Sequence, residues 1–161
     1  EGEGHFVAMV RKKEESSNSV KSVPYTFSKD KLSPEAEDFI KALGYPFDLE
    51  RIDVQKERVF YIPEKMPNVK GLRILRCGLY MGDMKKNRFE PSHALALWLK
   101  TCANVQDYSA DSAEMAKYIH GDVVPSVIRG WCLVTAGGYS IGWGKGDGTV
   151  LKNHYPKGLR R

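Results

Sequence analysis

Three cysteines are the first residues in the sequence that could support nucleophilic or metal chemistry. Cys77, Cys102 and Cys132 are widely spaced, and the sequence contains no CxxC pair. The four histidines do not join them at the spacing that tetrahedral zinc requires. An odd number of such cysteines is typical of free thiols in a reducing compartment, so we expect a cytoplasmic protein. Cys77 and Cys132 have no neighbouring base in the sequence, and Cys102 completes an apolar helical stripe that indicates a buried structural thiol. We therefore predict no catalytic residue and no metal site.

A second candidate is the glycine-rich stretch GWGKGDG at residues 142–148, which resembles a phosphate-binding loop. Its spacing does not fit GxGxxG, and it does not fit the Walker pattern because Gly146 follows Lys145. The stretch also opens no helix whose N-terminus could hold a phosphate group. We therefore predict a flexible turn here, and no cofactor bound by this chain.

Positive charge is concentrated in two blocks of the sequence, although the formal net charge is only +5. Residues 70–100 hold 7 basic and 2 acidic side chains, and residues 121–161 hold 6 and 2. Residues 1–69 hold 11 basic and 13 acidic side chains, and residues 101–120 hold 1 and 3. This clustering favours a polyanionic partner, most commonly nucleic acid. For a single block, a solvated basic surface is the simpler interpretation.

Rings that could contact RNA bases lie within the second basic block. His154 and Tyr155 stand between Lys152 and Lys157, so their rings could stack on exposed bases while the lysines hold phosphates. The alternative is an ordinary basic turn near the C-terminus. His93 either caps or packs at the start of a helix or contacts phosphate, and we favour the structural role.

Apolar periodicity and turn signals predict the elements that position these residues. In the first part of the chain we expect a buried strand at residues 5–10, a linker at residues 11–26, and a helix that begins at Ser33-Pro34 and ends at Gly44. Short strands are expected at residues 49–54, 58–62 and 71–76. A basic turn region follows at residues 78–90, and Pro91-Ser92 opens a second helix.

Glycines and short strands characterise the last third of the chain. A helix is expected from Asp111 or Ser112 to Gly121, and a hairpin is expected around Gly137-Gly138. In the expected hairpin register, Ala136 stands opposite Tyr139, Val134 opposite Ile141, and Cys132 opposite Trp143. A further strand at residues 149–151 completes a small β-barrel. The fold class is therefore α+β, with a domain boundary near residues 103–110.

Three segments resemble one protein family. They are GHFVAMVRK (4–12), GLRILRCGLYMGDMKKNRFEPSHALAL (71–97) and GWCLVTAGGYSIGWGKGDGTVLKNHYPKGLRR (130–161). Together they are similar to the C-terminal part of the Nop/Sun family of RNA 5-methylcytosine methyltransferases, in particular its RsmF-like bacterial branch. The resemblance implies four parts: the closing strand of a missing methyltransferase domain at 1–12, a linker at 13–27, an intermediate α+β domain at 28–104 and a PUA-like RNA-binding β-barrel domain at 105–161.

The resemblance also implies that the catalytic machinery lies elsewhere. Members of the family methylate carbon 5 of cytosine with a cysteine nucleophile in a Pro-Cys context, and a second cysteine in a Thr-Cys context assists product release. The sequence has no Pro-Cys, and its only Thr-Cys, at residues 101–102, lies downstream of the expected closing strand. No catalytic residue therefore carries over, and S-adenosylmethionine belongs to the missing catalytic domain.

The leading hypothesis is a module that binds structured ribosomal RNA and positions it for the catalytic domain of the same protein. The predicted RNA contacts are Arg73, Arg76, Lys85, Lys86, Arg88, Lys145, Lys152, Asn153, His154, Tyr155, Lys157, Arg160 and Arg161. The alternative is a protein-interaction module that docks on a ribosomal protein or braces the catalytic domain. No apolar run approaches the roughly 20 residues that span a bilayer, so no membrane partner is expected.

Overall fold

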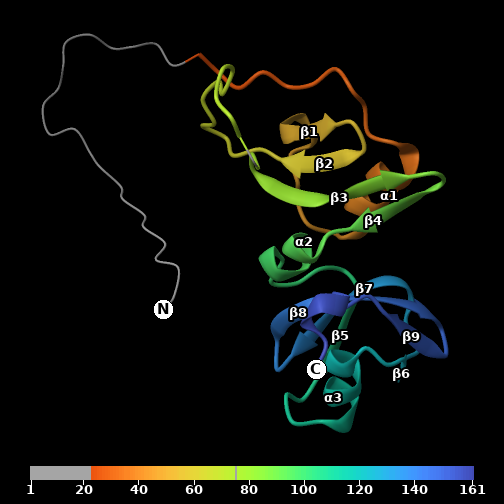
Figure 1. Ribbon diagram of the computed structural model, residues 1–161. Coiled ribbons are helices and arrows are strands. Elements are labelled where there is room, and N and C mark those ends of the chain that lie inside the picture. The colour runs from red at the N-terminus through yellow and green to blue at the C-terminus, as the bar shows by residue number, and fades with distance from the viewer. Residues whose placement is uncertain (1–22, 75) are drawn as a thin grey trace, which may run out of the picture.

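The computed structural model describes residues 23–74 and 76–161, which form two small β-sheets, one above the other in Figure 1. The strand expected at residues 5–10 and most of the expected linker lie outside the described residues. Helices and strands both contribute to each half, so the α+β class is confirmed. No helix within the described residues is long and apolar enough to cross a membrane.

The first sheet is antiparallel, with its strands in sequence order: β1 (Ile52–Gln55), β2 (Arg58–Tyr61), β3 (Leu79–Lys85) and β4 (Arg88–Pro91). Helix α1 (Pro34–Ala42) covers one face, and its buried residues are Ala36, Phe39 and Ile40. As expected, Ser33 caps this helix, because its hydroxyl accepts a hydrogen bond from the Ala36 amide at 3.3 Å. Gly44, at a φ of 65°, follows the end of the helix.

The strand expected at residues 71–76 is wrong. Leu72 and Ile74 alternate as in a strand, but they are 66% and 42% exposed because no layer formed by the described residues covers them. The third strand, β3, instead lies within the region expected to be a basic turn. The turn itself is only two residues long, Lys86 and Asn87, with Asn87 in the left-handed region at a φ of 57°.

Side-chain caps determine where two further elements of this half begin. The Asp48 carboxylate accepts a hydrogen bond from the Glu50 amide at 3.0 Å and stabilises a 3-10 turn, η1 (Leu49–Arg51). The strand expected at residues 49–54 therefore begins only at Ile52. Helix α2 (His93–Trp98) begins where expected, with Ser92 as its cap.

The second sheet curls into a half-barrel beside α3 (Ala113–His120) (Figure 1). Its order is β5-β7-β8-β9-β6, formed by β5 (Val105–Tyr108), β6 (Val124–Pro125), β7 (Arg129–Ala136), β8 (Tyr139–Asp147) and β9 (Val150–Asn153). A 3-10 turn, η2 (Lys157–Leu159), follows β9. The hairpin, the last strand and the helix between Ser112 and Gly121 are confirmed, whereas β5 and β6 were not expected.

A β-bulge between Val134 and Thr135 shifts the hairpin register by one residue from the expected one. Beyond the bulge, glycines rather than Ile141 and Trp143 stand opposite Val134 and Cys132. A shift of one residue moves a side chain to the other face of a sheet. Strand β8 also continues to residue 147, so the flexible turn expected at residues 142–148 is wrong.

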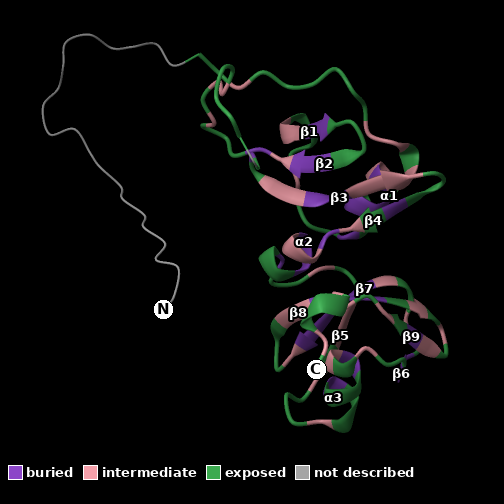
Figure 2. Ribbon diagram, viewed as in Figure 1, coloured by how far each residue is buried: buried purple, intermediate pink, exposed green. Residues whose placement is uncertain are grey.

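Because of this shift, Trp143 lies in a core shared by both halves of the molecule. The side chain is 2% exposed, and its ring lies 5.7 Å from that of Phe39 in α1. Its indole nitrogen donates a hydrogen bond to the Ser92 carbonyl at 2.8 Å. The hydroxyl of Ser140 also donates to the Leu99 carbonyl. Buried stretches, purple in Figure 2, run through β2, β4 and α2 above this junction.

Candidate nucleic-acid interface

A cleft of about 490 Å³ lies between α1, the β3–β4 turn and the edge of β7 and β8. We call it the interdomain cleft. Its cationic lining residues are Arg88 from the first half and Arg129 and Lys145 from the second. Its aromatic lining residues are Phe39, Phe89 and Trp131, and its carboxylates are Glu35 and Asp38 from α1. The cleft therefore combines cations from both halves with an aromatic floor.

Trp131 is the aromatic ring of the cleft that solvent can reach, because Phe39 and Phe89 are buried. The Lys145 ammonium lies 5.4 Å from the centre of the Trp131 ring, within cation–π range. The imidazole of His154 meets the same indole at 4.4 Å between ring centres. Proteins bind single-stranded RNA with this combination, in which an accessible ring stacks on a base and the neighbouring cations contact phosphates.

Two cations on neighbouring strands of the second sheet repel one another. Lys145 of β8 pairs in register with Lys152 of β9, and both are exposed. Like charges directly opposite each other in a sheet are destabilising, so this pair favours an anionic ligand beside it. Arg88 is partly neutralised, because its Nε atom lies 2.8 Å from the Glu90 carboxylate.

His154 is a titratable residue that lies against Trp131 of the cleft. Desolvation by burial lowers the pKa of His154, and the positive charges of Lys145 and Arg160 lower it further. Glu90, at the end of β4, acts in the opposite direction. The imidazole therefore binds a proton less readily than that of an ordinary histidine, and its flat ring lies against the ring of Trp131.

Only part of the first basic block reaches this cleft. Arg88 lines it and Lys86 is exposed in the adjoining turn, whereas Arg73, Arg76 and Lys85 lie elsewhere. Arg76 and Lys85 line a second cavity of about 710 Å³, which we call the sheet hollow. Folding thus separates residues that stand close together in the sequence.

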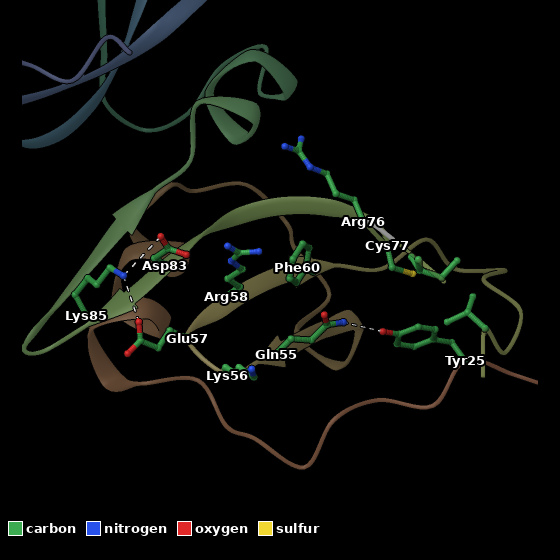
Figure 3. A pocket seen from close by; sticks show the side chains of 12 residues that line it. Tyr25, Gln55, Lys56, Glu57, Arg58, Phe60, Arg76, Cys77, Asp83 and Lys85 are labelled. Atoms are coloured by element: carbon green, nitrogen blue, oxygen red, sulfur yellow. Dashed lines mark hydrogen bonds and ion pairs between the residues drawn. The ribbon is translucent and has the colours of Figure 1, made fainter. Parts of the chain in front are cut away.

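The sheet hollow lies on β1, β2 and β3, and its lining has charges of both signs (Figure 3). Lys85 lies 3.2 Å from the carboxylate of Glu57 and 3.8 Å from that of Asp83. At its other end, the Tyr25 hydroxyl donates a hydrogen bond to Asp53 at 2.8 Å. The acidic partners reduce the attraction of this hollow for a polyanion.

Three of the predicted RNA contacts near the C-terminus have structural partners. The Asn153 amide donates to two backbone carbonyls, those of residues 118 and 122, at 2.7 and 3.1 Å. The Arg160 guanidinium donates to the Tyr155 carbonyl at 3.2 and 3.1 Å. The Tyr155 ring packs against Tyr118 and His93, at 5.6 and 5.7 Å between ring centres. Lys152, Lys157 and Arg161 remain exposed.

His93 lies at the junction of the two halves, where it packs as the favoured interpretation expected. Its Nδ1 atom is buried and has no hydrogen-bond partner among the described residues. Burial lowers the pKa of this imidazole. Its ring contacts that of Tyr155, and it is not among the lining residues of the interdomain cleft.

Two residues of the cleft, Arg129 and Trp131, were not identified from the sequence. They alternate with Cys132 along β7, so they project from the opposite face to the one that packs on α3. Arg129 lies over the β8–β9 turn, where a Cβ atom at Gly148 would come within 2.8 Å of its guanidinium carbon. Alternation along residues 129–133 was the signal that could have identified both.

The cysteines are neutral thiols in this structure. Burial raises the pKa of Cys132 to about 12, and burial also raises the pKa of Cys77 and of Cys102. A thiol of raised pKa is a poor nucleophile at neutral pH. Among residues 23–74 and 76–161, no group of three or more potential metal ligands comes together.

The half-barrel, with its helix and its basic aromatic edge, defines a PUA-like domain. Two family models match the chain in sequence order. The RsmF rRNA methyltransferase first C-terminal domain matches residues 38–99, and the methyltransferase RsmF PUA domain matches residues 105–161. The chain therefore belongs to the RsmF-like rRNA methyltransferases and represents their C-terminal region. A PUA domain implies RNA binding.

Proposed function

We propose that this chain holds ribosomal RNA in position for a catalytic domain of the same protein, which methylates carbon 5 of a cytosine. The observation that carries the proposal is the interdomain cleft, where Arg88 of one basic block meets Arg129 and Lys145 of the other beside Trp131. Phosphate contacts orient RNA and aromatic rings hold unpaired bases, so this arrangement suits a structured RNA with an exposed nucleotide.

Catalysis belongs to the other domain in this proposal. The three thiols of the described chain are held neutral by burial, and none lies beside a base that could activate it. S-adenosylmethionine would be bound by the catalytic domain. Incubation of this chain with labelled S-adenosylmethionine and unmodified ribosomal RNA should leave the RNA without label, and transfer of label to cytosine would contradict this division of labour.

A salt titration tests the cleft as the RNA surface. The variant Arg88→Ala/Arg129→Ala/Lys145→Ala should bind a ribosomal RNA fragment more weakly than the parent chain. If each cation meets one phosphate, the slope of log affinity against log salt should flatten by about 2, since each contact in single-stranded RNA contributes about 0.7. Fluorescence anisotropy at several salt concentrations gives that slope.

The matched control removes the same number of cations from the sheet hollow. The variant Arg58→Ala/Arg76→Ala/Lys85→Ala should change the slope by less than about 0.7, because Lys85 is already paired with Glu57 and Asp83 and the carboxylates in the lining weaken the attraction of the hollow for phosphates. Equal slopes for the parent and the cleft variant would rule out the cleft as the RNA surface.

A second candidate function, docking on the catalytic domain, is favoured by an aromatic surface around Trp98. Tyr45, Trp98 and Leu97 are 39%, 43% and 56% exposed, and the Phe47 ring stacks on Trp98 at 5.7 Å. Contiguous exposed apolar groups are typical of docking surfaces. Leu97→Lys should weaken binding to a separately produced catalytic domain, measured by calorimetry, and leave the RNA salt slope unchanged. Unchanged binding to that domain would eliminate this candidate.

A further inference from the structure

Helix α1 contributes negative charge to the lining of the interdomain cleft. Glu35 and Asp38 both line the cleft, and neither forms an ion pair among the described residues. Glu37, their neighbour on α1, instead pairs with Lys41 at 2.6 Å and is not a lining residue. Two unpaired carboxylates are unfavourable in a site that takes only phosphate groups.

Helix stability does not account for Asp38. A carboxylate stabilises a helix near its N-terminus, and this effect fades beyond the first turn. Glu35 stands in the first turn of α1, whereas Asp38 stands beyond it. Aspartate is also a weaker helix former than glutamate or alanine. Asp38 is exposed, so its carboxylate is accessible to a ligand that donates hydrogen bonds.

The geometry of the cleft supplies what a single nucleotide needs. Trp131 offers a partly exposed ring, the Lys145 ammonium lies 5.4 Å from the centre of that ring, and Arg129 lines the same cleft as the α1 carboxylates. The volume of about 490 Å³ lies within the usual range of small-molecule pockets. A base stacked on Trp131 would have its sugar-phosphate at the cations and its outer edge toward α1.

We propose that the interdomain cleft holds one unpaired nucleotide of the RNA, with its base on Trp131 and an amino-bearing edge toward Asp38. Carboxylates accept hydrogen bonds and donate none, so they select bases with amino groups. Guanine fits best, because its ring N–H and its amino group lie side by side and match the two oxygens of one carboxylate. Uracil has no amino group and fits worst. This inference rests on the proposed function, because it needs RNA in the cleft.

Short uridine oligomers of equal length, with one central base changed, test the inference at constant charge. The oligomer with a central guanosine should bind the whole chain at least about fivefold more tightly than uridine alone, since a bidentate base contact contributes about 1–3 kcal/mol of discrimination. Asp38→Ala should abolish this preference. Glu37→Ala, which removes the same charge from the same helix outside the cleft, should retain it. Melting curves of both variants check that the fold is intact.

The outcomes separate this inference from the proposed function. If the oligomers bind with steep salt dependence and show no base preference, the nucleotide subsite is wrong and the basic RNA surface stands. If the preference persists in Asp38→Ala, the carboxylate is not what reads the base, and the assignment is overturned. If neither these oligomers nor a ribosomal RNA fragment binds at low salt, the proposed function itself fails.

Discussion

The interdomain cleft and the sheet hollow are both lined by arginine, lysine and aromatic side chains, but they differ in what surrounds these groups. In the hollow, Lys85 lies beside Glu57 and Asp83, and the cations come from one half of the chain. In the cleft, Arg88 and Lys145 come from different halves of the chain, and the Glu35 and Asp38 carboxylates form no ion pair among the described residues. Charges that are not paired within the protein are available to a ligand, whereas pairing of charge cancels the local field.

The comparison shows that the density of charge in a sequence is a poor guide to a binding surface. Both cavities draw on the basic block at residues 70–100, yet only its last part reaches the cleft. What distinguishes the cleft is a shared core beneath it, in which Trp143 fixes the two halves together. Substitutions can test separately the core at Trp143, the accessible ring of Trp131, the packed ring of Tyr155 and the junction histidine, His93.

Replacement of Trp143 should have the largest effect. Trp143→Ala should lower the free energy of unfolding by about 3–5 kcal/mol, because it leaves a cavity between the two halves and removes the hydrogen bond to Ser92. Urea denaturation followed by circular dichroism measures this loss. Tyr139→Ala, at a residue that is 79% exposed, should change it by less than about 0.5 kcal/mol. Similar losses for both variants would refute the shared core.

Trp131→Ala should weaken RNA binding, and it should lower the free energy of unfolding by less than Trp143→Ala does. Stacking of a base on an aromatic ring contributes about 1–3 kcal/mol, and the salt slope should stay constant because no charge is removed. Phe60→Leu, in the lining of the sheet hollow, is the control and should leave RNA affinity unchanged. Equal loss of affinity in both variants would remove the distinction between the two cavities.

Tyr155 should act through the fold, although its sequence neighbours favoured a contact with RNA. Tyr155→Leu should lower the free energy of unfolding by about 1–2 kcal/mol, since the ring packs against Tyr118 and His93. RNA affinity should return to that of the parent chain at temperatures where the variant is fully folded. A melting curve and an RNA titration on the same sample test both statements. Weak binding by a fully folded variant would restore the stacking role.

The sequence predicted those elements that depend on local chemistry. Ser33, Ser92 and Ser112 each cap the helix that begins after them, and Gly121 ends the third helix in the left-handed conformation. The Gly137-Gly138 hairpin also forms. In each case the deciding contacts lie within a few residues of one another, so they can be recognised from the sequence alone.

The late start of β1 comes from the local cap at Asp48, but the larger failures depend on contacts between distant segments. The expected strand at residues 71–76 lacks a covering layer among the described residues, and β5 pairs in parallel with β7 more than twenty residues away. The β-bulge at Val134 decides whether Trp143 faces α3 or the other half of the chain. For the candidate site, Arg88, Lys145 and His154 were identified from charge clusters. Arg129 and Trp131 were not, although alternation along residues 129–133 places both on one face of β7; the shared core then shows that this face meets the cleft.

The smallest expected effect is a change of stability with pH. We expect histidines at the junction of the two halves to cause it, and not residues of the sheet hollow. Burial lowers the pKa of His93 below its ordinary value of 6.5, so below that value the unfolded chain binds the proton more readily than the folded one. The free energy of unfolding should therefore fall as the pH falls through 6.5 and should be constant above it. His154 has a pKa shift in the same direction and contributes with the same sign.

His93→Phe isolates the junction, because it retains a ring against Tyr155 and removes the titrating group. The parent chain should lose more stability than this variant between about pH 7.5 and pH 5.5, as urea denaturation would measure. His154→Gln should reduce the loss separately. The described lining of the sheet hollow has no histidine, and burial raises the pKa of Tyr25 and Cys77 there, so those groups titrate above neutral pH. A pH dependence that persists in the variant with both histidines replaced would show that the junction does not control it.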